Sequence, residues 1–316
     1  MRRALDYLER SPGESPVDIA SVLSGLVASC IETNHLAEAE KLCRRALAVD
    51  KQLLGPVHPN VARDLSSLGQ VLRAANRLPE AEKMYRRAIR ILKSSPNKDH
   101  ASLATGLSNL AQLLLITNRP AEAERLLRQA LAIDQEFLGQ THPSVARDLA
   151  NLAELLRATN RSSEAEQHIR QALDIAEMNL GKDHPRIAVC LSNLSTLLLM
   201  NRPAEAAQLI RRALSIDERS YGQDHPLVAI RLNNLATVLA RLNQLTDAEM
   251  KMRQALAIWQ QRSLGTDDPD LAKALFNLAV LLTKTNRFKE AEQRMRRALR
   301  IMWSIEKATG HALPER

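Results

Sequence analysis

A pattern of about 42 residues recurs roughly seven times along this 316-residue chain. Successive copies are spaced by 42, 42, 42, 42, 41 and 43 residues. They open at Val17, Pro59, Ala101, Pro143, Pro185, Pro226 and Pro269. A fixed period of this length indicates a stack of equivalent supersecondary units. We therefore expect residues 17–303 to form one elongated all-α solenoid, in which each unit contacts only its neighbours.

The first half of each copy has the spacing of an amphipathic helix. In the fourth copy, apolar residues recur at helical intervals at Val145, Leu149, Leu152 and Leu156. The opening proline suits a first helical turn, where its missing N–H is not needed. An Asn-Arg pair follows at 76–77, 118–119, 160–161, 201–202 and 286–287. Because asparagine tolerates the left-handed conformation, this pair predicts a tight turn between antiparallel helices.

The second half predicts another helix, which begins near a Glu-Ala-Glu motif at 38–40, 80–82, 122–124, 164–166 and 290–292. Arginine recurs four residues after the second Glu, as in Glu82/Arg86, which favours a solvated ladder of ion pairs along the helix surface. Leu-Gly ends this helix at 54–55, 138–139, 180–181 and 264–265. The second copy lacks the glycine, so we expect a different, looser connection over Ser94–His100.

Composition narrows the function classes. No apolar run approaches the ~18 residues of a membrane span, and the first residues have no signal-peptide core. Cys30, Cys43 and Cys190 have no metal or redox spacing, and we expect them to be reduced in a cytoplasmic protein. The net charge of +8 favours acidic partners, whereas 3% aromatic residues offer few stacking platforms for single-stranded nucleic acid.

Neither metal binding nor catalysis is predicted. One histidine recurs in five of the inter-repeat turns, at His58, His100, His142, His184 and His225. Equivalent residues of adjacent repeats lie about 10 Å apart, which is too far to share a zinc ion. The sequence has no Gly-rich phosphate loop and no nucleophile–base set. We therefore expect a protein with no enzymatic activity, no metal and no cofactor.

The two helices per unit, with Ala-Leu near the end of the second, resemble the tetratricopeptide repeat. Leu-Gly-x-x-His-Pro between repeats and Leu-x-Asn-Leu-Ala in the first helix are similar to the kinesin light chain class of that family, over residues 17–303. The resemblance implies a right-handed α-solenoid of about seven tandem helix-turn-helix repeats. It also implies that the first helices line a concave groove, in which such proteins bind peptide segments.

A column of asparagines in the first helices is the leading candidate for ligand contacts. It comprises Asn109, Asn151, Asn193, Asn234 and Asn277. Asparagine is a mediocre helix former, and its carboxamide can both donate to and accept from an extended peptide. In peptide-binding members of the family, the matching asparagine bonds the ligand. The alternatives are a bond to the neighbouring repeat, or inheritance through duplication.

Cations surround this column. The candidates are Arg63, Arg147, Lys273, Arg73, Arg157 and Arg241. Apolar residues interrupt them at Val189, Met200, Ile230 and Phe276, while only Glu32 and Glu154 oppose them. The pairs Arg147/Asn151 and Lys273/Asn277 resemble the carboxylate clamp of chaperone-binding members, although Val189 and Ile230 break its continuity. This composition fits an acidic peptide that carries one or two large apolar residues.

The two ends lie outside the regular pattern. Residues 2–5 match 44–47, so residues 1–16 correspond to the end of a second helix and a turn. The chain is then either a fragment of a larger protein, or its uncapped N-terminal edge pairs with another copy. Residues 304–316 should end the last helix near Gly310 and fray.

These observations leave three hypotheses for function. The first is a non-catalytic protein-interaction scaffold that binds a partner peptide in the groove. The second is a basic helical-repeat RNA-binding protein, whose affinity would fall steeply with salt. The third is a sensor array cut from a larger signalling NTPase.

Overall fold

The computed structural model describes residues 35–96, 99–262 and 268–309. This part of the chain consists of thirteen helices and has no strand, which confirms the all-α helical repeat. The first helices are α4 (Pro59–Ala74), α6 (His100–Ile116), α8 (Pro143–Ala158), α10 (Pro185–Leu198), α12 (Pro226–Arg241) and α14 (Pro269–Lys284). The second helices are α3 (Leu36–Leu54), α5 (Leu78–Ser94), α7 (Pro120–Leu138), α9 (Ser162–Leu180), α11 (Pro203–Tyr221), α13 (Leu245–Arg262) and α15 (Phe288–Thr309). None of the described helices is both long and apolar enough to cross a lipid bilayer.

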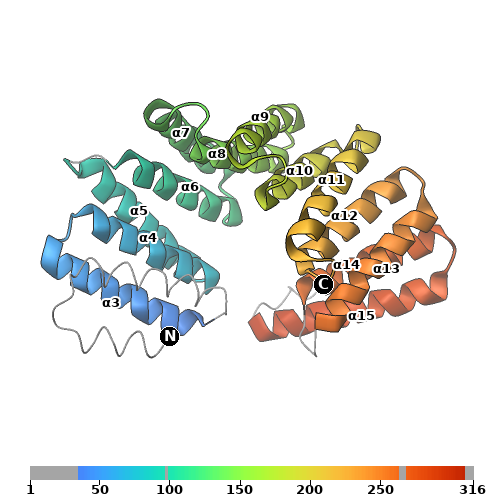
Figure 1. Ribbon diagram of the computed structural model, residues 1–316. Coiled ribbons are helices and arrows are strands. Elements are labelled where there is room, and N and C mark those ends of the chain that lie inside the picture. The colour runs from blue at the N-terminus through green and yellow to red at the C-terminus, as the bar shows by residue number, and fades with distance from the viewer. Residues whose placement is uncertain (1–34, 97–98, 263–267, 310–316) are drawn as a thin grey trace. The chain divides into compact units, whose positions relative to one another are not determined.

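The helices form two compact units, which divide within α9 between His168 and Ile169. Inside each unit, the first helix of a repeat packs on its own second helix, and that second helix packs on the next first helix. Figure 1 shows α3 to α8 stacked in this order in unit 1, and α10 to α15 in unit 2. Neighbouring first helices also touch, as in α6 with α8 and α12 with α14. The predicted segment 1–16, the first helix of the first copy and residues 310–316 lie outside the described residues.

The predicted apolar stripes form the core. Val145, Leu149, Leu152 and Leu156 are all buried in α8. The alanine of the Glu-Ala-Glu motif is also buried, and at Ala81 it is completely covered. A small residue there lets the paired helices approach closely, so the helical periodicity and the small-residue position together determine the packing of each hairpin.

Left-handed asparagines end most of the first helices. Their φ angles are +57° to +61° at Asn76, Asn118, Asn160, Asn243 and Asn286. The N–H of the next residue reaches back five residues, as in Arg77 N to Leu72 O at 2.8 Å, which is the Schellman arrangement. At Asn201 the predicted turn between α10 and α11 is present, but the left-handed conformation expected there is not, since its φ is not positive. This repeat is one residue shorter, and Arg202 N bonds the carbonyl four residues back, at Leu198.

Histidine caps the N-terminus of most first helices. The Nδ1 of His58, His142, His184 and His225 accepts a bond of 3.2 Å from the N–H two residues on. The structural prediction for the histidines is therefore confirmed at these four positions. His100 differs, because Asp99 caps α6 and His100 is its first residue. The connection before α6 also differs from the others, since α5 ends at Ser94 and Ser95 is extended, and residues 97–98 lie outside the described part.

Rings of alternating charges join the second helices of successive repeats. Arg86 Nη2 lies 2.8 Å from both Glu82 (α5) and Glu122 (α7), while Arg119 bonds the same two carboxylates. The hydrogen bond from Arg86 lowers the pKa of Glu122. The predicted ladder along one helix is thus confirmed, and the turn arginine extends it between repeats. Many arginines of this basic chain are committed to such bonds.

The ring recurs between other pairs of second helices. Equivalent residues form closed rings at Glu124, Arg128, Arg161 and Glu164, and at Glu249, Arg253, Arg287 and Glu290. Between α11 and α13 the sequence departs from this pattern. Ala207 and Gln244 replace the second-helix Glu and the turn Arg, so no ring can form there.

Candidate functional site

The five predicted asparagines lie on α6, α8, α10, α12 and α14, one on each first helix. Asn193 is exposed, while the other four are half-buried. Three of them bond the neighbouring first helix. Asn151 Oδ1 accepts from Gln112 at 3.4 Å. Asn234 Nδ2 donates to Ser192 at 3.2 Å, and Asn277 Nδ2 donates to Asn233 at 3.2 Å.

These bonds place part of each carboxamide between repeats, as one of the alternatives expected. They do not use every polar atom. Among the described residues, nothing hydrogen-bonds Asn277 Oδ1, and the buried Nδ2 of Asn109 has no partner. The Asn277 carboxamide is held through its Nδ2, so its orientation is fixed while Oδ1 can meet a ligand.

The predicted cations have different surroundings in the two units. In unit 1, Arg63 lies 3.9 Å from Asp50, and Arg147 lies 3.2 Å from Asp134. Both arginines therefore act as counter-ions of buried carboxyl groups. Arg73 contacts the hydroxyl of Tyr85, whose pKa is raised to about 12 by burial. Arg157 in unit 1, and Lys273 and Arg241 in unit 2, are exposed.

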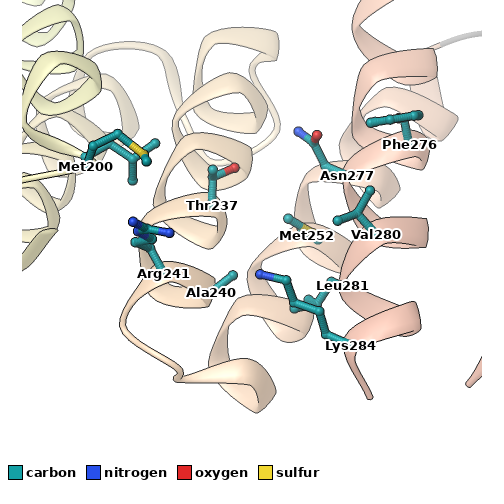
Figure 2. A pocket seen from close by; sticks show the side chains of 11 residues that line it. Met200, Thr237, Ala240, Arg241, Met252, Phe276, Asn277, Val280, Leu281 and Lys284 are labelled. Atoms are coloured by element: carbon teal, nitrogen blue, oxygen red, sulfur yellow. The ribbon is translucent and has the colours of Figure 1, made fainter. Parts of the chain in front are cut away.

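Unit 2 contains an open cavity of about 240 Å³ on the face of its first helices. Its lining comes from the segment after α10 (Leu199, Met200), from α12 (Thr237, Ala240, Arg241), from α13 (Met252) and from α14 (Phe276, Asn277, Val280, Leu281, Lys284). Figure 2 shows these side chains directed from three successive repeats towards a common space, with Lys284 extending towards α12.

The cavity combines apolar surface with positive charge. Met200, Phe276 and Val280 remain 63%, 45% and 42% exposed. Such large apolar side chains are normally covered, and a cluster of them on a surface marks an interaction site. Arg241 and Lys284 stand beside them, and none of the eleven lining residues is acidic.

Sequence reasoning identified part of this site. The structure brings together the predicted Asn277, Arg241, Met200 and Phe276. It adds Val280, which lies one helical turn after Phe276 and could have been found by continuing that column of α14. Six predicted residues belong to unit 1 and line no part of this cavity: Asn109, Asn151, Arg63, Arg147, Arg73 and Arg157. Asn193, Asn234 and Lys273 lie in unit 2 outside the lining.

The helix pairs and their spacing agree with a match to a known family. The sequence matches the tetratricopeptide repeat over residues 18–94, 102–178, 151–219, 200–261 and 228–302. The chain belongs to the tetratricopeptide repeat family. No curated protein sequence matches the chain significantly.

Solved structures share the tetratricopeptide fold at low sequence identity. A kinesin light chain-like protein of Podosopora anserina, with nearly identical TPR-like repeats, is 22% identical with a TM-score of 0.57, covering 66% of this chain and 99% of its own. The apo form of RapI is 13% identical with a TM-score of 0.69, covering 91% of this chain and 99% of its own. The Rap conjugation gene regulator of plasmid pLS20, in complex with the Phr* peptide, is 16% identical with a TM-score of 0.63, covering 92% and 75%. The predicted kinesin light chain-like repeat is thereby confirmed as a fold.

Proposed function

We propose that this tetratricopeptide repeat protein is a non-catalytic scaffold that binds a peptide segment of a partner protein on the face of its first helices. The observation that carries the proposal is the cavity of unit 2, where exposed apolar side chains and two cations meet on three successive repeats. A cleft with an apolar floor and a few polar groups is the usual form of a binding site. One structural neighbour was solved with a peptide bound, which supports the same use of the fold.

The chemistry of the cavity selects the ligand. Met200, Phe276 and Val280 can cover one large apolar side chain, whose burial contributes roughly 1.5–3 kcal/mol. Arg241 and Lys284 can pair with acidic residues next to it. The free Oδ1 of Asn277 can accept a hydrogen bond from a peptide N–H. The ligand we propose is therefore an acidic peptide with an apolar anchor.

The RNA-binding hypothesis has less support. Many arginines form rings with glutamates, so fewer of the 44 lysines and arginines are free to bind phosphates. The cavity also offers one aromatic ring, Phe276, where a strand of bases would need several. The cytoplasmic location, self-association through the N-terminal edge and the sensor-array hypothesis stay predictions.

Binding of labelled peptides can test the proposal. The probes are fluorescein-labelled peptides with a central Leu, Met or Phe flanked by Asp and Glu, and a second set flanked by Lys and Arg. We expect the acidic set to bind, and the charge reversal Arg241→Glu/Lys284→Glu to weaken that binding by at least about tenfold, or 1.4 kcal/mol. Fluorescence anisotropy measures the affinity.

Two controls make the result specific. Arg297→Glu reverses an exposed charge on α15, outside the cavity, and should leave binding unchanged. Phe276→Ala should weaken binding without changing its salt dependence, because it removes apolar contact alone. Preferential binding of the basic peptides, or of a single-stranded oligonucleotide with steep salt dependence, would contradict the proposal.

A further inference from the structure

Aspartate occupies the same buried position in alternate repeats. Asp50 (α3), Asp134 (α7) and Asp217 (α11) are each at most 1% exposed, and each lies where a second helix packs on the next first helix. The second helices that alternate with them, α5, α9 and α13, have apolar residues at this position: Leu92, Ala176 and Trp259. The chain therefore alternates polar and apolar junctions between successive repeats.

The residue facing this aspartate differs between the two units. On α12 of unit 2 it is Arg231, whose Nε lies 2.9 Å from Asp217 Oδ2 in a buried ion pair. At the equivalent positions of unit 1 it is a second aspartate, Asp64 on α4 and Asp148 on α8, both at most 2% exposed. Unit 1 thus buries two carboxyl groups where unit 2 buries opposite charges.

The α7/α8 junction shows how incompletely such a pair is compensated. Arg147 Nη2 lies 3.2 Å from Asp134 Oδ2 and 3.1 Å from Asp148 Oδ1, and Ser108 of α6 donates to Asp148 Oδ1 at 3.0 Å. His142, in the connection before α8, is the other titratable group that acts on Asp134. The remaining oxygens, Asp134 Oδ1 and Asp148 Oδ2, are buried without a partner among the described residues. One arginine therefore serves two buried carboxyl groups.

At the α3/α4 junction, the charge of the buried carboxyl groups is compensated less. Arg63 is the cation that faces this pair among the described residues, and it lies 3.9 Å from Asp50, beyond hydrogen-bonding distance. Asp50 Oδ2 and Asp64 Oδ2 are both buried and unpartnered. Two adjacent carboxylates cannot both stay ionised cheaply in such surroundings, whereas a proton held between them removes one charge and supplies the missing hydrogen bond.

We propose that the pairs Asp50/Asp64 and Asp134/Asp148 are proton-binding switches between repeats, each holding one shared proton in acid and releasing it near neutral pH, so that acidification tightens unit 1. The α11/α12 junction of unit 2 has no such switch, because Arg231 takes the place of the second carboxyl group.

The titration behaviour supports this direction. Burial, and then the charge of Asp50, raises the pKa of Asp64 to about 7. Burial raises the pKa of Asp148 to about 6, with Arg147 opposing it and Asp134 adding to it. In the unfolded chain an aspartate titrates near 3.9. The folded state therefore binds more protons between about pH 4 and 7, and its stability falls as pH rises through that range.

The ring glutamates titrate below this pH range. The ring glutamates have lowered pKa values, as at Glu82 and Glu124, so the stability they contribute is lost only as pH falls below about 4.5. Burial raises the pKa of Asp217 as well, and Arg231 opposes that rise. A comparison between pH 5.5 and 8.0 thus separates the aspartate pairs of unit 1 from the ring glutamates.

Hydrogen exchange of the full chain at these two pH values tests the proposal. After correction for the intrinsic exchange rate, we expect the opening of α4 and α8 to increase at least about tenfold from pH 5.5 to 8.0, the factor that one pKa unit represents. Trp259 and Trp303 both lie in unit 2, so their fluorescence follows the unfolding of that unit in a urea titration. As an internal control, the urea midpoint measured in this way should change little between pH 5.5 and 8.0.

The variant Asp64→Asn/Asp148→Asn mimics the protonated form and should make unit 1 insensitive to pH over this range. Asp217→Asn, as the matched control, should leave the pH dependence of unit 1 in place. If the double variant fails to fold, carboxyl carbon NMR of the wild-type protein gives the answer directly. Two aspartates titrating between pH 5.5 and 7.5 are expected, and titration of every aspartate below pH 5 would overturn the proposal.

Discussion

At the scale of single residues, glycines in neighbouring first helices have different surroundings. Position 69 on α4 is glycine because the ring of Tyr85 lies against it, and an added Cβ would be 2.7 Å from Tyr85 Cε1. Gly106, on α6, has more room, since its added Cβ would meet Ile89 Cγ1 at 3.4 Å. The contact with Tyr85 thus explains the glycine at position 69, whereas no close contact requires a glycine at position 106.

This difference predicts opposite effects of one substitution. Gly69→Ala should destabilise the protein by about 1–3 kcal/mol, because the buried Tyr85 ring cannot move away. Gly106→Ala should be neutral or stabilise by up to about 1 kcal/mol, because alanine favours the helix and fits the space. Urea unfolding followed by circular dichroism measures both. Equal effects of the two substitutions would show that the Tyr85 contact is unimportant.

How much the sequence predicted depends on the range of the interactions. The turn at Asn160, the position of His142 in an inter-repeat turn and the ion pair Glu82/Arg86 depend on residues close in sequence, and each was predicted correctly. Asn201 lies in the predicted turn without the left-handed conformation, because this repeat is one residue shorter. The cavity was only partly predicted, because the approach of Val280 to Met200 depends on how three repeats stack.

At the scale of helices, the rings of charge are a surface feature that links neighbours without contributing much individually. Each member is partly exposed, so solvent and salt screen its bonds. Their regular recurrence nevertheless sets the register between successive second helices. Between α11 and α13 that register depends on other contacts, among them the buried pair Asp217/Arg231 between α11 and α12.

Installing the missing ring should stabilise unit 2. Ala207→Glu with Gln244→Arg places a glutamate and an arginine beside Arg211 and Asp247, which already occupy the other two ring positions. We expect a higher melting temperature in low salt, and loss of the gain in 1 M NaCl, where the Debye length is about 3 Å. The control Ala207→Gln/Gln244→Arg lacks the carboxylate, and an equal gain in that variant would exclude the ring as the cause.

At the scale of the whole chain, the regular unit is a pair of repeats. Asp50 and Asp134 are 84 residues apart, and Asp134 and Asp217 are 83 apart, whereas the helix pattern itself recurs every 42. The alternation was present in the sequence but had no visible meaning until the structure placed these residues at the junctions. It is independent of the ligand cavity and follows from which residues are buried between neighbours.

The alternation predicts that removing an even number of repeats is tolerated better than removing an odd number. Excising residues 59–142 removes an even number of repeats and rejoins Asp50 to Asp148, two surfaces of the same kind. Excising residues 59–100 removes one repeat and leaves Asp50 opposite Gly106, a lone carboxyl group on an apolar seam. The variant that lacks residues 59–142 should thus melt at a higher temperature than the variant that lacks residues 59–100, although length alone predicts the reverse. Calorimetry of both truncations measures the two melting temperatures. Chains of this type should tolerate lengthening and shortening by two repeats at a time.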